Sequence, residues 1–177
     1  MLSKEHTLAE LWGDGMSLSD FNLITDRTQA DVDRRAELKA KGWPAMTTEE
    51  RAEWVTPLKG SYSYVDMNRV EGAVEYVANK LAESGYIVRP VVKKNWSIED
   101  KPTISDLNRY LKNVEDIRAA LTSFPSTPSA PTTRKKLNYQ MANDIEQILI
   151  DVDTLVNNMI RTRRWCGELV CGEVLYK

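Results

Sequence analysis

A long apolar stripe near the carboxyl end constrains the fold most. Between residues 136 and 161, apolar side chains recur at alternating steps of four and three, which is the period of one helix face. Such a helix would be roughly 38 Å long. The stripe predicts either the inner face of a single-chain bundle, the commoner arrangement, or a self-association seam such as a trimeric fibre has. The candidate assembly residues are the stripe and a nearby tryptophan: Met141, Ile145, Ile148, Val152, Leu155, Met159 and Trp165.

Two further stripes predict helices in the middle of the chain. The first helix is expected to begin with Asp66 as its N-cap and to end at Gly85, and the second runs from about 104 to 121. Between them, the β-rich run 86–92 is expected as one short strand, interrupted by Pro90. The stripe residues are Met67, Val70, Val74, Val77 and Leu81, then Ile104, Leu107, Leu111, Val114, Ile117 and Leu121.

Capping signals predict two shorter helices, at 28–41 and about 48–56. Each begins after a threonine that an acid follows three residues later, and each ends at a residue that stops helices. Trp43 and Trp54 flank this unit and are expected to form its small core. The capping and stop residues are Thr28, Asp31, Gly42, Thr47, Glu50 and Pro57.

Composition changes most sharply at residues 123–135, where three prolines stand among serines and threonines. This segment is expected to be an extended linker that frees the last helix to sit apart.

The chain closes with Cys-Gly-Glu-aliphatic repeated five residues apart, which predicts an irregular strand or tight hairpin able to pair with a neighbour's sheet edge. The expected fold is mainly α, a helical bundle or hairpins, divided into a docking arm (1–25), a helical domain (26–122), the linker, and a long helix plus terminal strand (136–177).

A short sequence repeats forty residues apart. Asp66-Met-Asn-Arg69 is matched by Asp106-Leu-Asn-Arg109, and a Val-Glu pair follows each at the same distance. Two matches do not make a solenoid. They predict two helices that begin alike, with an acid near the N-terminus, where the helix dipole favours negative charge.

Charge and hydropathy exclude several classes of protein. The net charge is −2, and the basic runs 134–136 and 161–164 are short and stand at helix ends, so we expect solvated charge and no nucleic-acid partner. No stretch approaches the ~18 apolar residues of a membrane span, and residues 1–10 lack the apolar core of a secretory signal. We therefore expect no membrane partner.

Nothing in the chain calls for catalysis, a metal or a cofactor. The single histidine, His6, stands near the N-terminus, and Cys166 and Cys171 have neither zinc-site spacing nor a disulfide framework around them. Glycines are scattered at turns and form no phosphate-binding loop. Acidic pairs such as Glu49-Glu50 and Asp151/Asp153 lie on charged helix faces. A non-enzymatic protein is expected.

Several segments together resemble structural proteins from the tail modules of phages and prophages of Gram-positive bacteria. They are DRTQADVDRRAELKAKGW (26–43), the run 46–78, NWSIEDKPT (95–103), the following Asn-Arg-Tyr-Leu-x-Asn-Val, and 137–159 with its Gly-Glu repeat. The resemblance covers most of the chain from about residue 24. It implies a virion component near the tail tip, baseplate or fibre, but no catalytic residue.

This resemblance implies contacts with other tail proteins and with further copies of the chain, in three- or six-fold symmetry. Two alternatives stay open. A cytoplasmic helical assembly chaperone or regulator would form a dimer and be absent from finished particles. A tail-tip cell-wall hydrolase would need a carboxylate pair or a histidine in a cleft.

Overall fold

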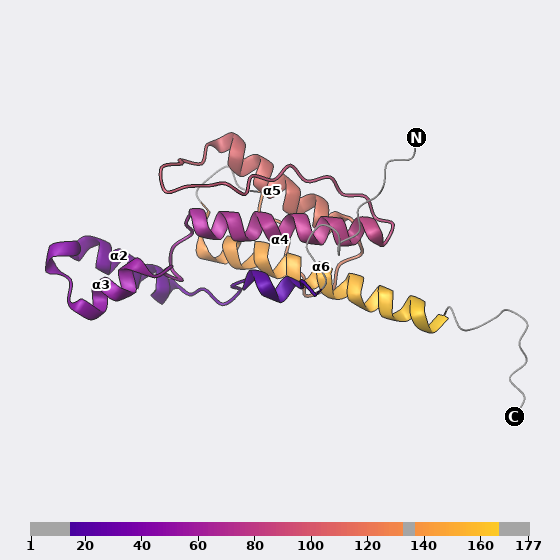
Figure 1. The fold of residues 1–177 in the computed structure, drawn as a ribbon, viewed down its shortest axis with the longest axis horizontal. Coiled ribbons are helices and arrows are strands. Elements are labelled where there is room, and N and C mark those ends of the chain that lie inside the picture. Colours follow the sequence, from indigo (N-terminus) through magenta and orange to yellow (C-terminus); the bar gives the residue numbers. More distant parts are fainter. Residues whose placement is uncertain (1–14, 133–136, 167–177) are drawn as a thin grey trace, which may run out of the picture.

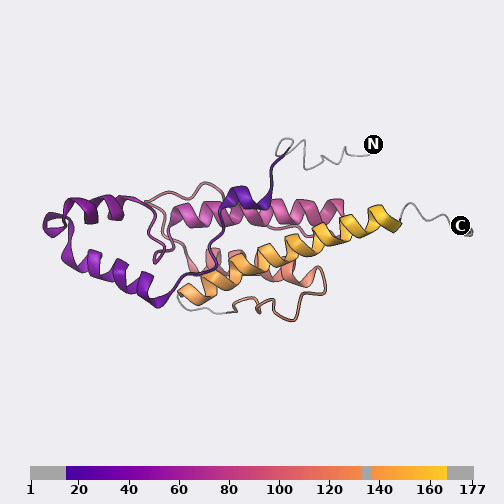
Figure 2. The ribbon, with the colours of Figure 1, turned by 90° about the horizontal axis from the view of Figure 1, so that it is seen from below.

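A bundle of three helices forms the centre of the molecule. The computed structural model describes residues 15–132 and 137–166, with side chains up to Thr162. Helices α4 (Tyr64–Glu83), α5 (Ile104–Ala119) and α6 (Tyr139–Cys166) pack against one another, and the short helix η1 (Leu18–Phe21) lies on α4 (Figures 1 and 2). The predicted mainly α fold is confirmed, and the described residues contain no strand.

The apolar stripes of the three helices meet in the core. On α4 the stripe from Val70 to Leu81 is fully buried, and it packs with Val114 and Ile117 of α5. Each such side chain contributes roughly 1.5–3 kcal/mol when fully buried. The predicted α5 stripe extends one turn too far, because Ile104 is 65% exposed at the first turn of the helix.

The stripe on α6 faces the protein's own core. Ile145, Ile148 and Val152 have no exposed surface and pack in the three-helix core, so this structure leaves them no surface for a partner. Met141, Leu155 and Met159 keep part of their surface, and their role in assembly stays a prediction. The side chain of Trp165 lies outside the described side chains.

A helical hairpin projects from one end of the bundle (Figure 1). It consists of α2 (Gln29–Lys41), the short helix η2 (Trp43–Ala45) and α3 (Thr48–Val55). The predicted caps Thr28 and Thr47 are confirmed, each in a capping box. Ion pairs join α2 to α3: Arg34 to Glu53 at 2.8 Å and Lys41 to Glu50 at 2.6 Å. The prediction for Trp43 is wrong: it is 50% exposed, and the buried apolar residues here are Leu38 and Met46.

Two helix boundaries differ from those predicted. Helix α4 begins one turn early, with Ser63 as its N-cap and Asp66 as the third helical residue that completes the capping box. Helix α6 covers 139–166 instead of 136–161. Residues 86–92 form no strand; they run extended along the bundle, where Asn113 of α5 holds Val91 through its backbone.

The proline-rich segment is packed and does not release α6. Thr127 is buried and donates a hydrogen bond to Asp151 of α6 at 2.6 Å, and Arg118 of α5 donates to the carbonyl of Pro128 at 2.6 Å. The last helix therefore belongs to the bundle. The predicted terminal strand and residues 1–14 of the predicted arm lie outside the described residues. None of the described helices combines the length and the hydropathy needed to cross a membrane.

Candidate functional site

A mainly apolar groove of about 490 Å³ lies where the hairpin joins the bundle. Its walls are the end of α3, the 56–63 connection and the first turn of α4, with Ile98 from the connection between α4 and α5. Large apolar side chains on these walls face solvent: Val55 is 71% exposed, Ile98 83%, and Tyr64 and Val65 about 40%. Gathered exposed apolar residues mark interaction surfaces, whereas single ones do not.

The groove carries one charged side chain. Arg35 of α2 lines it, and no carboxylate does. Within the described part of the chain, no ion pair or hydrogen bond occupies the Arg35 guanidinium. The site therefore offers apolar surface with a positive charge at its edge, which suits an apolar polypeptide segment that carries an acid.

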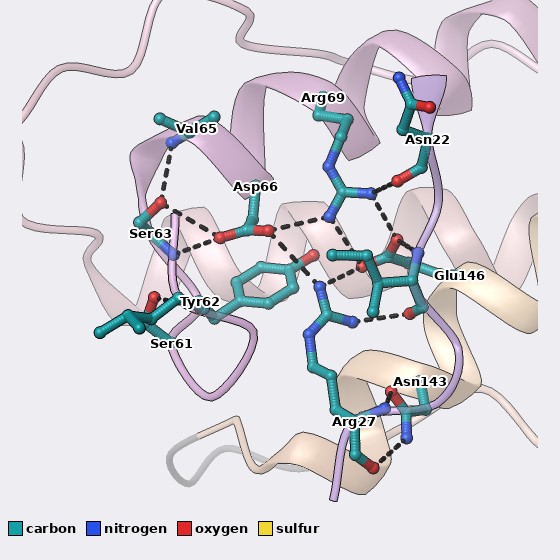
Figure 3. A network of polar contacts seen from close by, with 12 residues as sticks. Asn22, Arg27, Ser61, Tyr62, Ser63, Val65, Asp66, Arg69, Asn143 and Glu146 are labelled. Carbon is teal, nitrogen blue, oxygen red and sulfur yellow. Dashed lines mark hydrogen bonds and ion pairs between the residues drawn. The ribbon is translucent and has the colours of Figure 1, made fainter. Parts of the chain in front are cut away.

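A buried ionic cluster fixes the base of the hairpin (Figure 3). Glu146 of α6, which has no exposed surface, lies 2.8 Å from both Arg27 and Arg69. Asp66 of α4 accepts from Arg69 at 2.8 Å and from Arg27 at 3.4 Å. Burial alone would lower the pKa of Arg69, but the charges and hydrogen bonds of Glu146 and Asp66 outweigh it and raise that pKa. Removing one partner of such a cluster costs about 3–5 kcal/mol.

The same cluster ties together the two connections of the hairpin. Arg27 immediately precedes the cap of α2, and its backbone N–H and carbonyl bind the side-chain amide of Asn143 at 3.1 and 2.9 Å. On the other connection, Lys59 pairs with Asp26 at 2.7 Å. Gly60 lies so close to α2 that a Cβ would come 1.9 Å from the carbonyl oxygen of Asp31. The hairpin is thus held against the bundle at both of its connections.

The contacts of Glu146 and Asn143 form a first clamp. A second clamp, built on Glu71 and Asn68, positions the segment that carries Ile98. Buried Glu71 of α4 accepts from the backbone N–H of Lys93 at 2.6 Å, from the indole of Trp96 at 3.0 Å, and from both terminal nitrogens of Arg109. Asn68 exchanges two hydrogen bonds of 2.8 Å with the backbone of Trp96. Because Trp96 is fixed two residues before Ile98, this clamp sets one wall of the groove.

Part of this arrangement follows from the sequence. The repeated Asp-x-Asn-Arg does mark similar helix starts, since Asp66 and Asp106 both complete capping boxes. The repeat does not predict that Arg69 and Arg109 each reach a buried glutamate on a neighbouring helix. A second repeat marks both glutamates in the sequence: Asn-x-x-Glu stands at 68–71 and again at 143–146.

The acidic pairs singled out earlier are engaged in structural contacts. Glu50 accepts from the backbone N–H of Thr47 to complete the capping box of α3 and pairs with Lys41, and Asp153 pairs with Lys80. Asp151 accepts from Thr127 and Gln147. Among the residues whose side chains are described, no group of three or more His, Cys, Asp or Glu is placed to hold a metal ion. His6, Cys171 and the side chain of Cys166 lie outside that part.

Comparison of the chain with protein-family models, with curated proteins and with solved structures gave no match.

Proposed function

We propose that the chain is a non-enzymatic structural protein of a bacteriophage tail, in the tail-tip, baseplate or fibre region, and that it acts through protein contacts at the groove. One observation carries the proposal: exposed apolar residues gather in a groove whose walls are fixed by buried ionic clamps. A surface that is both apolar and rigid loses little conformational freedom on binding, which favours stable association. The resemblance of segments between residues 26 and 159 to tail-module proteins supports the location in the virion.

The hairpin adds a second surface to this role. It projects from the bundle and presents Trp43, half exposed, at the turn between its helices, where the Arg51 guanidinium lies 5.3 Å from the ring centre. Tryptophan and arginine are enriched at interface hot spots. An arm of this kind suits a protein that contacts neighbours in a repeated array.

Mass spectrometry of purified particles tests the proposal. Particles from a host that encodes the chain should contain it in a fixed ratio to known tail proteins. An Ile98→Asp variant should be incorporated much less, whereas Ile87→Asp should match wild type, because Ile87 is also largely exposed but lies outside the groove. Finding the chain only in lysate would refute the virion role and favour the assembly chaperone, and lysis of purified host cell wall by the chain would favour the hydrolase.

A further inference from the structure

The groove beside the hairpin has a matching sequence within the same chain. Residues 166–175 contain Cys-Gly-Glu followed by two aliphatic residues, twice in succession. Each repeat places one acid next to an apolar pair, and the groove places Arg35 next to apolar walls. We infer that this C-terminal segment of one copy docks in the groove of a second copy and joins the copies head to tail. The inference rests on the proposed assembly function and names the partner of its groove.

The length of α6 assigns the segment to a neighbouring copy. Asn143, near the start of α6, binds Arg27 at the base of the hairpin, and the hairpin lies at the opposite end of the molecule from the described end of α6 (Figure 1). From residue 143 to residue 166 the helix rises roughly 35 Å. Seven further residues span at most about 25 Å. Glu168 and Glu173 therefore cannot return to the groove of their own chain.

The amino-terminal residues are a weaker match for the groove. Tyr76, in the second half of α4, donates a hydrogen bond to the carbonyl of Met16, and the chain then runs along α4 to Arg27 at the hairpin base. Residues before 16 therefore start at the end of α4 away from the groove. They contain a single acid beside an apolar pair, Glu10-Leu11-Trp12, and a Trp12→Asp variant tests them as the competing occupant.

Contact between two different surfaces has a consequence for symmetry. A contact between the C-terminal segment and the groove is heterologous, so it generates a closed ring if the rotation per copy closes and an open fibre if it does not. A symmetric groove-to-groove contact would stop at a dimer. An assembly larger than a dimer would therefore exclude a symmetric groove-to-groove contact.

Sedimentation velocity of the full chain in reducing buffer, which prevents disulfides between copies, tests the inference. Wild type should associate as its concentration rises. Two variants should each stay monomeric with unchanged helical content: a groove variant, Ile98→Asp or Val55→Asp, and a C-terminal variant, Val170→Asp with Val174→Asp. An equimolar mixture of the two should form dimers and nothing larger. The intact C-terminal segment of one meets the intact groove of the other, and no further junction can form.

A charge exchange tests the role of Arg35. Arg35→Glu should weaken association by roughly tenfold or more, and Glu168→Arg with Glu173→Arg in the same chain should restore it. The inference is overturned if the C-terminal variant associates like wild type, if only Trp12→Asp abolishes association, or if the mixture stays monomeric. A wild-type chain that is monomeric at every concentration but present in particles would overturn self-docking while the proposed tail function stands.

Discussion

Asn68 of α4 and Asn143 of α6 hold two distant segments of backbone in the same way. Each side-chain amide both accepts from the N–H and donates to the carbonyl of one residue, Trp96 and Arg27 respectively. Three residues further along each helix stands a fully buried glutamate. It accepts a hydrogen bond from the backbone N–H of the residue three positions before the one that the asparagine holds. These second contacts are Glu71 with Lys93 and Glu146 with Ile24. Both clamps also receive an arginine from another helix, Arg109 and Arg69.

Glu146→Gln should lower the free energy of unfolding by about 3–5 kcal/mol, because it leaves Arg27 and Arg69 buried with one carboxylate in place of two. Urea denaturation followed by circular dichroism measures the loss. Glu115→Gln on the exposed face of α5 is the matched control and should change stability by less than about 0.5 kcal/mol. Equal effects of the two substitutions would contradict the buried role of Glu146.

Asn68→Ala should cost about 1–3 kcal/mol, since two backbone groups of Trp96 lose their partners. Hydrogen exchange of the Trp96 N–H should speed up. The control is Asn108→Ala, at the same place in the repeated Asp-x-Asn-Arg but exposed on α5. Equal stability of the two alanine variants would show that the hydrogen bonds from Asn68 to Trp96 do not stabilise the fold.

Gly60→Ala should destabilise the base of the hairpin, because the added Cβ meets backbone atoms of α2 and not a movable side chain. The cost of such overpacking is about 1–3 kcal/mol or more. Faster hydrogen exchange in the first turn of α2 should accompany the loss. Ala40→Ser, exposed on the same helix, should leave that exchange unchanged.

Alkaline pH should destabilise the fold through Tyr62 and Tyr110, whose hydroxyls are hydrogen-bonded to each other. Burial raises the pKa of both hydroxyls above their ordinary value near 10. In the unfolded chain they lose protons above about pH 10 while the folded protein retains them, so stability falls there by up to about 1.4 kcal/mol per pH unit for each tyrosine. Denaturation midpoints from pH 8 to 11.5 should show this fall, and a flatter fall in Tyr110→Phe.

Local signals predicted much of the fold. Helix caps such as Thr28 and Thr47 depend on four neighbouring residues, so their chemistry is legible in the sequence. The predicted cap of α4 is wrong because Ser63 and Asp66 belong to one capping box, in which the serine is the N-cap and the acid is the third helical residue. The apolar stripes were legible because helix periodicity follows from spacing alone.

The candidate site could not be predicted from the sequence in the same way. Glu71 and Glu146 look like solvated charges in sequence, and only tertiary packing brings arginines and backbone N–H groups to them. The groove depends on Val55 and Ile98, which lie 43 positions apart and belong to no stripe. Residues of this kind become a surface only when the clamps place their segments side by side.

The two chain ends of the hairpin, at Arg27 and Ser63, meet in one buried cluster (Figure 3). A segment whose two ends are neighbours can be lengthened, shortened or replaced while the rest of the domain keeps its path, which is the geometry that tolerates inserted domains. The stretch 28–59, which ends before the core-packed Tyr62, is therefore the part of the chain where replacement should be tolerated best. New binding specificities could be grafted there onto an unchanged three-helix body.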